Sequence, residues 1–132
     1  PEMCPCAGSW AMCKGLGLDL CEIARMEPLE QDGRFLARYF TEAEVAYIRS
    51  REAGAAQTLA GMFAAKEAVL KALGTGLSLP IQEIEITHTE TRQPQITLHG
   101  RAAQTLADRG GGQLMVSITH EAGMPAAVVL WS

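Results

Sequence analysis

The first regular pattern along the chain is an alternation of apolar residues with small or polar ones, at a period of two. In GLGLDL, residues 15–20, three leucines alternate with two glycines and Asp19. This spacing is typical of a half-buried strand, and it places Asp19 on the same face as the glycines. Because glycines carry no side chain, we expect open space in front of Asp19, and such space is what a ligand requires.

The second half of the chain repeats the strand pattern. The stretches IQEIEITH (81–88) and QITLH (95–99) alternate on either side of a polar loop and predict a hairpin. GRAAQTLADR (100–109) has the spacing of a short amphipathic helix, and LMVSITH (114–120) alternates again. The closing run AAVVLW (126–131) is apolar throughout, which predicts a strand covered on both faces.

Helical patterns concentrate in the first half. Residues 34–51 indicate a helix, a break and a second helix, with Thr41 and Glu44 at the spacing of a capping box. The stretch 55–73 is long, rich in good helix formers and followed by Gly74, a typical C-cap. Helices early, strands late and one strand at the start together predict a mixed α+β domain.

Composition limits the classes of protein that the chain can be. It has 132 residues, 48% of them hydrophobic and 20% charged, as expected for one soluble globular domain, which we place at 14–132. The formal net charge of −4 argues against sequence-independent binding to nucleic acid. The longest apolar run is far shorter than the roughly 20 residues of a membrane helix, so we predict no membrane partner and a cytoplasmic location.

All four cysteines lie near the start of the chain, at a spacing that matches no common zinc or disulfide framework. They are Cys4, Cys6, Cys13 and Cys21. Residues 1–13 also show no periodicity, and a flexible leader, a cloning remnant and the edge of a longer parent chain are all consistent with them. A metal cluster organised by the cysteines is one functional alternative, and it predicts that deleting these residues releases bound metal.

The stretch FAAKEAVLKALGTG, residues 63–76, places charges in an alanine- and leucine-rich helix. Glu67 and Lys71 have the i, i+4 order of an ordinary ion pair, which contributes about 0.2–0.5 kcal/mol and needs no function. Lys66 falls instead on the apolar stripe, where a buried charge favours an anionic partner. The glycine-bracketed Thr75 adds backbone N–H groups that a phosphate can approach closely.

Asp19 and the charges of this helix are more informative together than apart. Mg²⁺ binds oxygen ligands and is commonly held by one or two carboxylates, with phosphate oxygens and water completing its coordination. Asp19 and Glu67 are therefore candidate Mg²⁺ ligands, while the lysines would face the remaining phosphate charge.

Histidine supplies a further candidate element. His120 ends the strand VSITH, with Ser117 and Thr119 sharing the other face. A lone strand-end histidine is more often structural than catalytic, so this residue is not diagnostic by itself. The other two histidines, His88 and His99, have weaker contexts still.

Five stretches carry more than a secondary-structure pattern. They are GLGLDLCEIARM (15–26), RFLARYFTEAEV (34–45), LAGMFAAKEAVLKALGTG (59–76), QPQITLHGRA (93–102) and VSITHEAGMPAAVVL (116–130). In order and spacing they resemble the holo-acyl-carrier-protein synthase family of 4′-phosphopantetheinyl transferases. The most specific parts are the G-x-D-x-x-E-I strand and the F-A-A-K-E-A-x-x-K-A-x-G-T-G helix, a pair that seldom recurs by chance at this separation.

The resemblance implies a fold, a reaction and an assembly. The fold is that of 4′-phosphopantetheinyl transferases, a small antiparallel sheet packed with a long helix. In the reaction, coenzyme A gives its 4′-phosphopantetheine group to a serine of apo acyl carrier protein and leaves as adenosine 3′,5′-bisphosphate. By position, Asp19, Glu67 and Lys71 look like the catalytic residues, with Asp19 and Glu67 as the Mg²⁺ ligands. Small members of the family are homotrimers with sites between subunits, and we expect the same here.

The resemblance also implies binding residues. Coenzyme A contacts are expected from one set of positions: Lys66, Lys71, Gly74, Thr75, Gly76, Ser117, Thr119 and His120. The acidic acyl carrier protein is expected to dock on basic residues with apolar anchors: Arg25, Met26, Arg34, Phe35 and Arg38. A basic face on an acidic protein steers such a partner without making the whole surface adhesive.

Three departures separate this sequence from the family pattern. Met62 stands where many members have a basic residue, so that Arg49 or Arg51 would have to supply a phosphate contact. The hairpin loop reads TRQP instead of an Asn/Gly-rich turn, and the cysteine-bearing leader has no counterpart. The alternative from another functional class is a catalytically silent module of the same fold that binds a carrier protein or a nucleotide. The joint presence of the three catalytic positions favours the enzyme, because binding alone does not need a metal pair.

Overall fold

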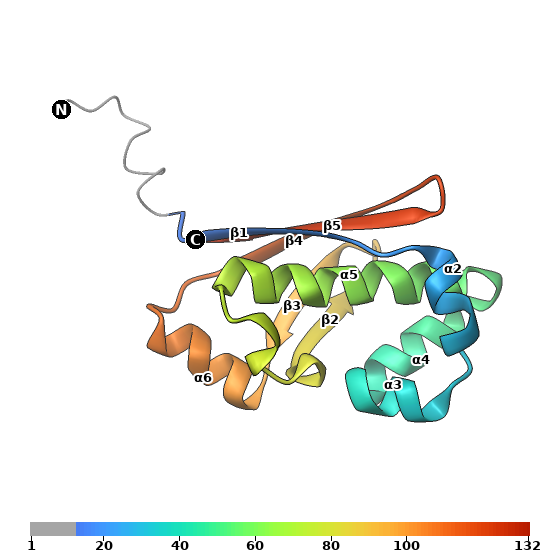
Figure 1. Cartoon of the computed structure of the whole chain (residues 1–132), viewed down its shortest axis with the longest axis horizontal. Coiled ribbons are helices and arrows are strands. Elements are labelled where there is room, and N and C mark those ends of the chain that lie inside the picture. Colours follow the sequence, from blue (N-terminus) through green and yellow to red (C-terminus); the bar gives the residue numbers. More distant parts are fainter. Residues whose placement is uncertain (1–12) are drawn as a thin grey trace.

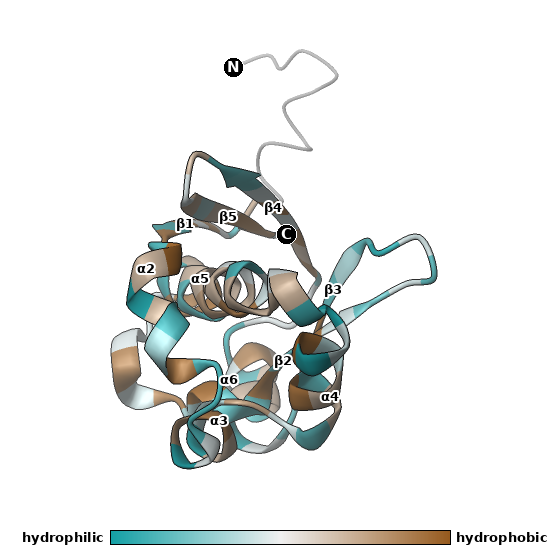
Figure 2. Cartoon of the chain, turned by 90° about the vertical axis from the view of Figure 1, so that its right-hand side faces the viewer, coloured by the Kyte–Doolittle hydropathy of each residue, from teal (hydrophilic) through white to brown (hydrophobic). Residues whose placement is uncertain are grey.

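Helix α5 is the central element around which the rest of the chain packs. The computed structural model describes residues 13–132. Figure 1 shows α5 between a three-stranded sheet on one side and the other helices and a two-stranded hairpin on the other. Figure 2, turned by 90°, shows the same arrangement with α5 seen nearly end-on. The predicted α+β fold, with a small antiparallel sheet packed on a long helix, is confirmed.

The helices and strands follow the chain in the order that Figure 1 labels. They are β1 (Gly15–Leu20), α2 (Ile23–Met26), α3 (Gly33–Tyr39), α4 (Glu42–Ser50), α5 (Ala55–Leu73), β2 (Ile84–His88), β3 (Pro94–Leu98), α6 (Gly100–Asp108), β4 (Leu114–Glu121) and β5 (Met124–Trp131). Short 3-10 turns connect several of them: η1 (Glu27–Leu29), η2 (Glu52–Gly54), η3 (Gly76–Ser78) and η4 (Ile81–Glu83).

The three-stranded sheet is antiparallel and has the strand order β1–β5–β4. Ala127 of the central strand lies opposite Asp19 of β1 on one side and opposite Ile118 of β4 on the other. Strands β2 and β3 form a separate antiparallel pair. The predicted hairpin is confirmed, although Ile81–Glu83 forms a 3-10 turn before β2 begins.

Strand β1 turns its glycine face toward α5. A Cβ atom on Gly17 would overlap the backbone carbonyl of Ala68, and one on Gly15 would overlap that of Ala72. The glycines therefore let the strand and helix backbones approach closely. The leucines point away and are exposed: Leu16 by 64%, Leu18 by 59% and Leu20 by 56%. The expectation of open space in front of Asp19 is wrong, because α5 occupies the space beside the glycines.

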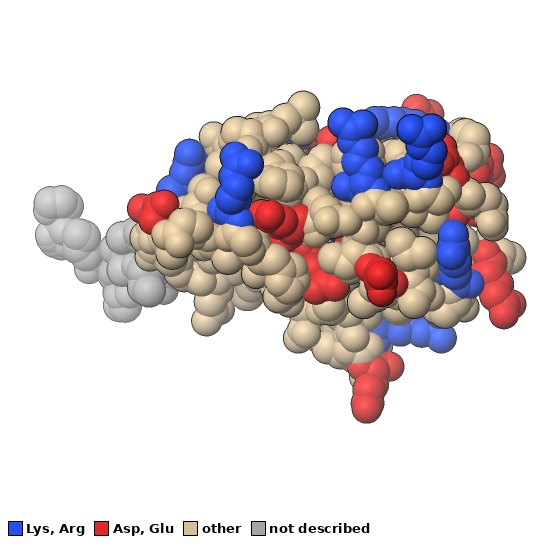
Figure 3. All heavy atoms as spheres, turned by 90° about the horizontal axis from the view of Figure 1, so that it is seen from below, with Lys and Arg blue, Asp and Glu red and all other residues tan. Residues whose placement is uncertain are grey.

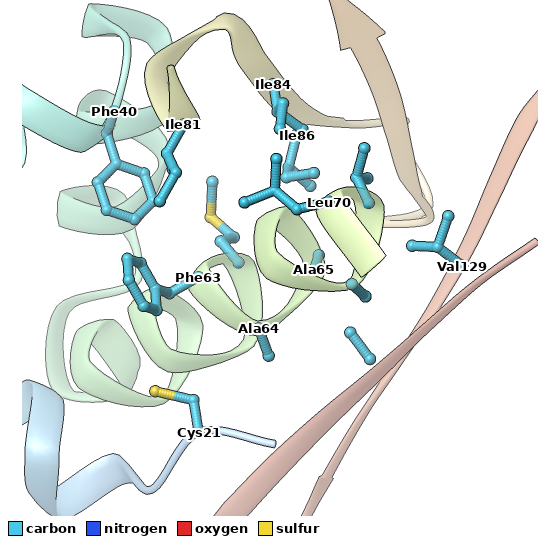
Figure 4. Close-up of a cluster of buried hydrophobic side chains, with 14 of the residues drawn as sticks. Cys21, Phe40, Phe63, Ala64, Ala65, Leu70, Ile81, Ile84, Ile86 and Val129 are labelled. Carbon is cyan, nitrogen blue, oxygen red and sulfur yellow. The ribbon is translucent and has the colours of Figure 1, made fainter. Parts of the chain in front are cut away.

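Helix α5 has the predicted bounds and the predicted end. Gly74 follows it with φ 72°, in the left-handed region that favours glycine at a C-cap. On the side away from the sheet, Figure 4 shows large buried side chains around the helix: Phe40, Phe63, Leu70, Ile81, Ile84 and Ile86. Toward the sheet the helix presents alanines, which keep the distance between helix and strands short.

The predicted capping box at the start of α4 is confirmed. Thr41 Oγ1 accepts a hydrogen bond from the Glu44 backbone N–H at 3.2 Å, and Glu44 Oε1 accepts one from the Thr41 N–H at 2.9 Å. Glu44 is also buried, and its second oxygen accepts from the backbone N–H of Ile86 at 2.7 Å. One side chain therefore caps α4 and ties it to β2.

Strand β5 is covered on one face only, against the prediction of two covered faces. Its buried positions alternate with more accessible ones, and Val128 is 38% exposed. The neighbouring strand β4 shows the same alternation, with Met115 exposed by 52%. The outer face of the sheet therefore carries large exposed apolar side chains, and within the described residues no element packs against it (Figure 1).

Some expectations about the whole chain stay predictions. Residues 1–12 of the predicted leader lie outside the described residues. Among residues 13–132, no helix is both long enough and apolar enough to span a membrane. The cytoplasmic location and the single domain over 14–132 are not tested by this finding.

Candidate active site

Asp19, Glu67 and Lys71 come together where β1 crosses the second half of α5. The glycine face of β1 carries Asp19 toward the helix, and the i, i+4 spacing puts Glu67 and Lys71 on the flank beside it. Lys71 Nζ donates to Asp19 Oδ1 at 2.8 Å and to the backbone carbonyl of Leu18 at 3.0 Å. The side chain of Lys71 is 57% exposed and that of Asp19 only 13%, so the group opens to solvent on the lysine side.

The charges of this group are incompletely paired. Asp19 Oδ2 is buried and has no hydrogen-bond partner in the described part of the chain. Burial raises the pKa of Glu67, and the neighbouring Asp19 carboxylate raises it further. Arg25 and Lys71 lower the pKa of Glu67 but do not reverse this shift. The hydrogen bond to Asp19 is the main reason that the pKa of Lys71 is raised.

This arrangement fits a hard divalent cation. A cation between the two carboxylates would satisfy Asp19 Oδ2 and relieve the repulsion that raises the pKa of Glu67. The described residues hold no group of three or more His, Cys, Asp or Glu side chains placed to bind a metal. A cation at Asp19 and Glu67 would therefore take its other ligands from phosphate oxygens or water, as Mg²⁺ commonly does.

The cysteine-cluster alternative gains no support from residues 13–132. Cys13 is exposed, Cys21 is buried, and both are free thiols. Burial raises the pKa of the Cys21 thiol, which makes it a poorer metal ligand. Cys4 and Cys6 lie outside the described residues, so the part of the prediction that concerns them stays a prediction.

The prediction for Lys66 has to be corrected, because this lysine lies in the core and not at the candidate active site. Its side chain is 0% exposed, and Nζ donates to Glu44 Oε1 at 2.8 Å. Two further bonds go to the backbone carbonyls of Ile84 at 2.7 Å and Ile81 at 3.3 Å, which uses all three donors of the ammonium group. Burial lowers the pKa of Lys66, while Glu44 raises it. The expected contact with coenzyme A is wrong, because this lysine finds its anion within the chain.

The predicted docking residues lie on α2 and α3. Arg25, Arg34 and Arg38 are exposed, and Phe35 is half-buried. Figure 3 shows basic side chains grouped at the end of the molecule that α2, α3 and α4 form, with acidic side chains among them. Met26 is a correction: it is 1% exposed and belongs to the core, because α2 packs against α5. It is not available as a surface anchor.

A hollow of about 530 Å³ lies between this basic end and Glu67. Its walls include Arg25, Arg38 and the ring of Phe63, over which the Arg25 guanidinium lies 5.7 Å from the ring centre. Leu77, which is 79% exposed, adds an apolar rim. The hollow therefore combines positive charge and apolar surface next to one of the candidate metal ligands.

The glycine-bracketed turn follows α5 directly after the helix residues of the site. Gly74 and Gly76 have φ 72° and 58°, values at which a side chain would be strained. The hydroxyl of Thr75 donates to the Gly76 carbonyl at 3.2 Å. The structure thus places this turn near Lys71, while its contact with coenzyme A stays a prediction.

Ser117, Thr119 and His120 divide between the two faces of β4. Ser117 and Thr119 are exposed on the outer face of the sheet. His120 turns inward, where its ring approaches Gly61 of α5 closely enough to clash with any side chain there. The predicted split of these three residues between two faces is confirmed.

The structure does not bring His120 to Asp19 within one chain. Met62 of α5 lines a cavity together with His120, whereas Glu67 lies with Asp19. Met62 and Glu67 are five residues apart, which at about 100° per residue places them about 140° apart around the helix. The predicted site residues therefore form two groups on opposite flanks of α5.

The cavity beside His120 is lined by Arg51, one of the two arginines named as a substitute for the basic residue missing at Met62, and by three residues that the sequence analysis did not place in the site: Tyr47, His88 and Arg92. The rings of Tyr47 and His88 are stacked, with centroids 3.9 Å apart and an interplanar angle of 6°. The Arg51 guanidinium lies 6.0 Å from the centre of the Tyr47 ring. The i, i+4 spacing of Tyr47 and Arg51 predicts that these two side chains are neighbours on a helix. His88 and Arg92 join them in the cavity lining only through the tertiary structure.

Comparison with known proteins identifies the class of protein. Residues 15–123 match the family model of the 4′-phosphopantetheinyl transferase superfamily. A holo-[acyl-carrier-protein] synthase of Treponema denticola is 42% identical over 120 residues, covering 90% of this chain and 98% of that protein. One of Moorella thermoacetica is 47% identical over 116 residues, covering 86% and 90%. The fold and the site thus define a 4′-phosphopantetheinyl transferase.

Solved structures agree with this class. The holo-[acyl-carrier-protein] synthase of Helicobacter pylori in complex with coenzyme A has a TM-score of 0.77 at 31% identity, covering 89% of this chain and 99% of that one. That of Neisseria meningitidis has a TM-score of 0.81 at 26% identity, covering 92% and 99%. The chain belongs to the holo-acyl-carrier-protein synthase family, and its reaction transfers 4′-phosphopantetheine from coenzyme A to apo acyl carrier protein. The predicted family, fold and enzymatic function are confirmed.

Proposed function

We propose that the chain performs this transfer with Mg²⁺ held by Asp19 and Glu67, and with Lys71 on the diphosphate of coenzyme A. The observation that carries the proposal is the buried Asp19 Oδ2 beside Glu67, which has no hydrogen-bond partner among residues 13–132. Lys71 adds support, because its ammonium group is anchored to Asp19 and yet open to a ligand. The retention of all three groups argues for catalysis and not for binding alone.

The residues suit phosphoryl chemistry, which needs charge neutralisation and positioning more than covalent help. Mg²⁺, when bound, supplies a Lewis acid that withdraws charge from the diphosphate. Asp19 and Glu67 fix the place of that charge, since β1 and α5 hold both carboxylates on packed elements. Lys71 holds a further positive charge, and its raised pKa keeps it protonated while negative charge develops on the leaving group.

The basic end of the molecule is the proposed docking face for the acyl carrier protein. Arg25, Arg34 and Arg38 supply exposed positive charge, and Phe35 supplies apolar contact. The hollow beside Glu67 would give the carrier's serine a path from this face to the diphosphate. Electrostatic complementarity of this kind raises the rate of association with an acidic partner.

A complete site is proposed to form between neighbouring copies in a homotrimer. Asp19 and His120 lie on opposite flanks of α5, so one coenzyme A molecule that uses both needs Ser117, Thr119 and His120 from a second copy. The uncovered sheet face supports assembly, because its exposed side chains are large and apolar: Leu16, Leu18, Leu20, Met115 and Val128. Contiguous apolar surface of this kind commonly marks a protein interface.

Mass spectrometry of the carrier protein tests the proposal directly. Apo acyl carrier protein, coenzyme A, Mg²⁺ and this protein should give a carrier heavier by about 340 Da, the covalent mass of the phosphopantetheinyl group. A carrier with alanine in place of its acceptor serine should gain nothing, and an excess of EDTA should abolish the gain. Unmodified carrier in the complete reaction would refute the transfer, and full transfer in EDTA would refute the Mg²⁺ site.

A further inference from the structure

Strand β1 and helix α5 touch backbone to backbone beside the candidate metal ligands. Figure 1 shows β1 running along α5. A Cβ atom on Gly17 would overlap the carbonyl oxygen of Ala68 and would lie 2.8 Å from the backbone nitrogen of Ala72. Any side chain at position 17 would therefore push the strand and the helix apart by roughly 1 Å or more, until the atoms reach an ordinary non-bonded distance.

Both sides of this contact adjoin the candidate active site. Gly17 lies two residues before Asp19 and on the same face of β1. Ala68 directly follows Glu67 in α5. The carboxylate of Asp19 is close enough to Glu67 to raise the pKa of that residue. The backbone spacing at this contact therefore sets how far apart the two carboxylates stand.

Packing fixes both partners of this contact. Gly17 lies opposite Val129 of β5, and Asp19 lies opposite Ala127. Val129, Ala127 and Ala68 are exposed by 1% or less. Strand β5 packs on α5 as well as pairing with β1, and closely packed interiors resist continuous deformation. The two carboxylates are therefore presented at a fixed separation, from packed elements and not from loops.

A fixed separation favours one size of cation. Mg²⁺ binds oxygen at about 2.0–2.1 Å, whereas Ca²⁺ binds it at about 2.3–2.6 Å and tolerates irregular coordination. For a cation held by one oxygen from each of two carboxylates, the larger ion needs up to roughly 1 Å more space. A side chain at position 17 would cause a displacement of comparable size. The choice between the two ions therefore depends on how closely β1 approaches α5.

We propose that Gly17 is a positioning residue that holds Asp19 and Glu67 at the separation Mg²⁺ requires, and so makes the site select Mg²⁺ over Ca²⁺. Gly17 offers no side chain to the cation or to the substrate. It acts because nothing lies between the backbones of β1 and α5 at this point. The inference rests on the proposed function, since it takes these two carboxylates as the Mg²⁺ ligands.

Gly15 provides a matched control on the same strand. A Cβ atom there would overlap the carbonyl oxygen of Ala72, which is a clash of the same kind as at Gly17. Gly15 lies four residues before Asp19, which is about 13 Å along an extended strand. Gly15→Ala and Gly17→Ala should therefore both lower the urea concentration at the midpoint of unfolding, while only Gly17→Ala should change the choice of metal.

Metal binding is measured directly on the full chain with coenzyme A present. Bound Mn²⁺ loses its sharp free-ion EPR signal, so the signal that returns on adding Mg²⁺ or Ca²⁺ gives the affinity for each ion, after subtraction of a titration without protein. The wild type and Gly15→Ala should bind Mg²⁺ more tightly than Ca²⁺. Gly17→Ala should lose about 10–100-fold in Mg²⁺ affinity, as is usual for groups that orient metal ligands, and less in Ca²⁺ affinity. Adding Asp19→Glu to Gly17→Ala should recover part of the loss, because the longer side chain restores the reach of the carboxylate.

Three outcomes would overturn the inference and leave the proposed function intact. One is a Gly17→Ala protein with wild-type affinities for both ions, and another is an equal loss of Mg²⁺ affinity in Gly15→Ala. The third is a wild type that binds Ca²⁺ as tightly as Mg²⁺, a measurement that needs no variant and decides the question if Gly17→Ala does not fold. Failure of the Mg²⁺ site itself would show differently, as a wild type that binds no Mn²⁺ and transfers phosphopantetheine in EDTA.

Discussion

Helix α5 carries two lysine–carboxylate pairs of equal length in opposite surroundings. Lys66 Nζ lies 2.8 Å from Glu44 Oε1 with both side chains 0% exposed, and Lys71 Nζ lies 2.8 Å from Asp19 Oδ1 with side chains 57% and 13% exposed. In the first pair the lysine uses all its donors and both glutamate oxygens accept hydrogen bonds. In the second, one buried aspartate oxygen accepts none from the described residues.

The difference shows that ion-pair distance does not identify a functional site. A buried pair is stable only if the surrounding hydrogen bonds compensate for lost hydration, and the Lys66–Glu44 pair meets that condition within one chain. The Asp19 pair leaves an unsatisfied oxygen beside a second carboxylate, so it has a reason to bind a cation. A functional site is better indicated by a polar atom that lacks a hydrogen-bond partner, in a group of side chains that solvent can reach.

The largest effect is expected from breaking the buried pair. Lys66→Met leaves the Glu44 carboxylate buried without its counterion, and removal of one partner from a buried pair typically costs about 3–5 kcal/mol. Urea unfolding should show this loss in the free energy of unfolding. The double variant Lys66→Met/Glu44→Leu should recover only part of it, because the backbone N–H groups of Thr41 and Ile86 still lose their acceptor. A single variant as stable as the wild type would contradict the structural role of this pair.

The open pair should respond to mutation in activity and not in folding. Glu67→Gln removes one of the two candidate Mg²⁺ ligands, and we expect transfer to the carrier protein to fall by about 10²–10³-fold, as for loss of one strong electrostatic contact. Its free energy of unfolding should change by less than about 0.5 kcal/mol, because Glu67 is only partly buried and glutamine keeps its size. The measurement is a mass-spectrometric rate at varied Mg²⁺. Full activity with unchanged Mg²⁺ dependence would refute the metal role.

A third variant tests whether the activity of the Lys71–Asp19 site depends on a neighbouring copy of the chain. Leu18 lies directly before Asp19 but on the uncovered face of the sheet. Leu18→Asp should therefore weaken assembly by about 2 kcal/mol or more, as at a central interface position. The packing of β1 on α5 should not change. Sedimentation should show a shift from trimer to monomer, accompanied by lower activity at low protein concentration. Leu77→Asp is the control for sedimentation alone, because Leu77 is exposed by 79% against 59% for Leu18 and lies outside the sheet, on the rim of the hollow beside Glu67. A trimeric, fully active Leu18→Asp protein would contradict assembly through this face.

The smallest expected effect is in the pH dependence of stability without metal. The raised pKa of Glu67 means that the folded state holds its proton more tightly, so this residue lowers the free energy of unfolding as pH rises from the usual carboxyl pKa through the raised one. In EDTA, the free energy of unfolding of Glu67→Gln should therefore rise relative to that of the wild type as pH increases over that range. Mg²⁺ should reduce this difference.

Glu85 offers a matched control of the opposite sign. Its pKa is lowered, first by the hydrogen bond from His99 and then by that from Thr41. It therefore contributes stability above the usual carboxyl pKa that is lost as pH falls through the lowered value. Glu85→Gln should lose stability relative to the wild type as pH rises from the lowered pKa to the usual carboxyl pKa, which is below the window where Glu67→Gln gains stability. Urea unfolding from pH 3 to pH 8 distinguishes the two, and parallel curves for both variants would contradict the assigned shifts.

Local sequence signals predicted most of the elements and half of the site. The capping box at Thr41 and the glycine end of α5 were readable because they depend on residues within four positions of each other. The i, i+4 spacing likewise placed Glu67 and Lys71 on one flank. Asp19 was found from its neighbours in β1, although for a reason that the structure corrects.

What the sequence alone determined is therefore local: the helices, the strands, and the pairing of charges along one helix. The tertiary structure decided which face of each element is covered. A period of two defines two faces of β1 without saying which one packs, and close approach of α5 selected the glycine face and left the leucines exposed. The burial of Lys66 and Met26 was decided in the same way, because their partners come from other elements and burial is a property of the packed chain.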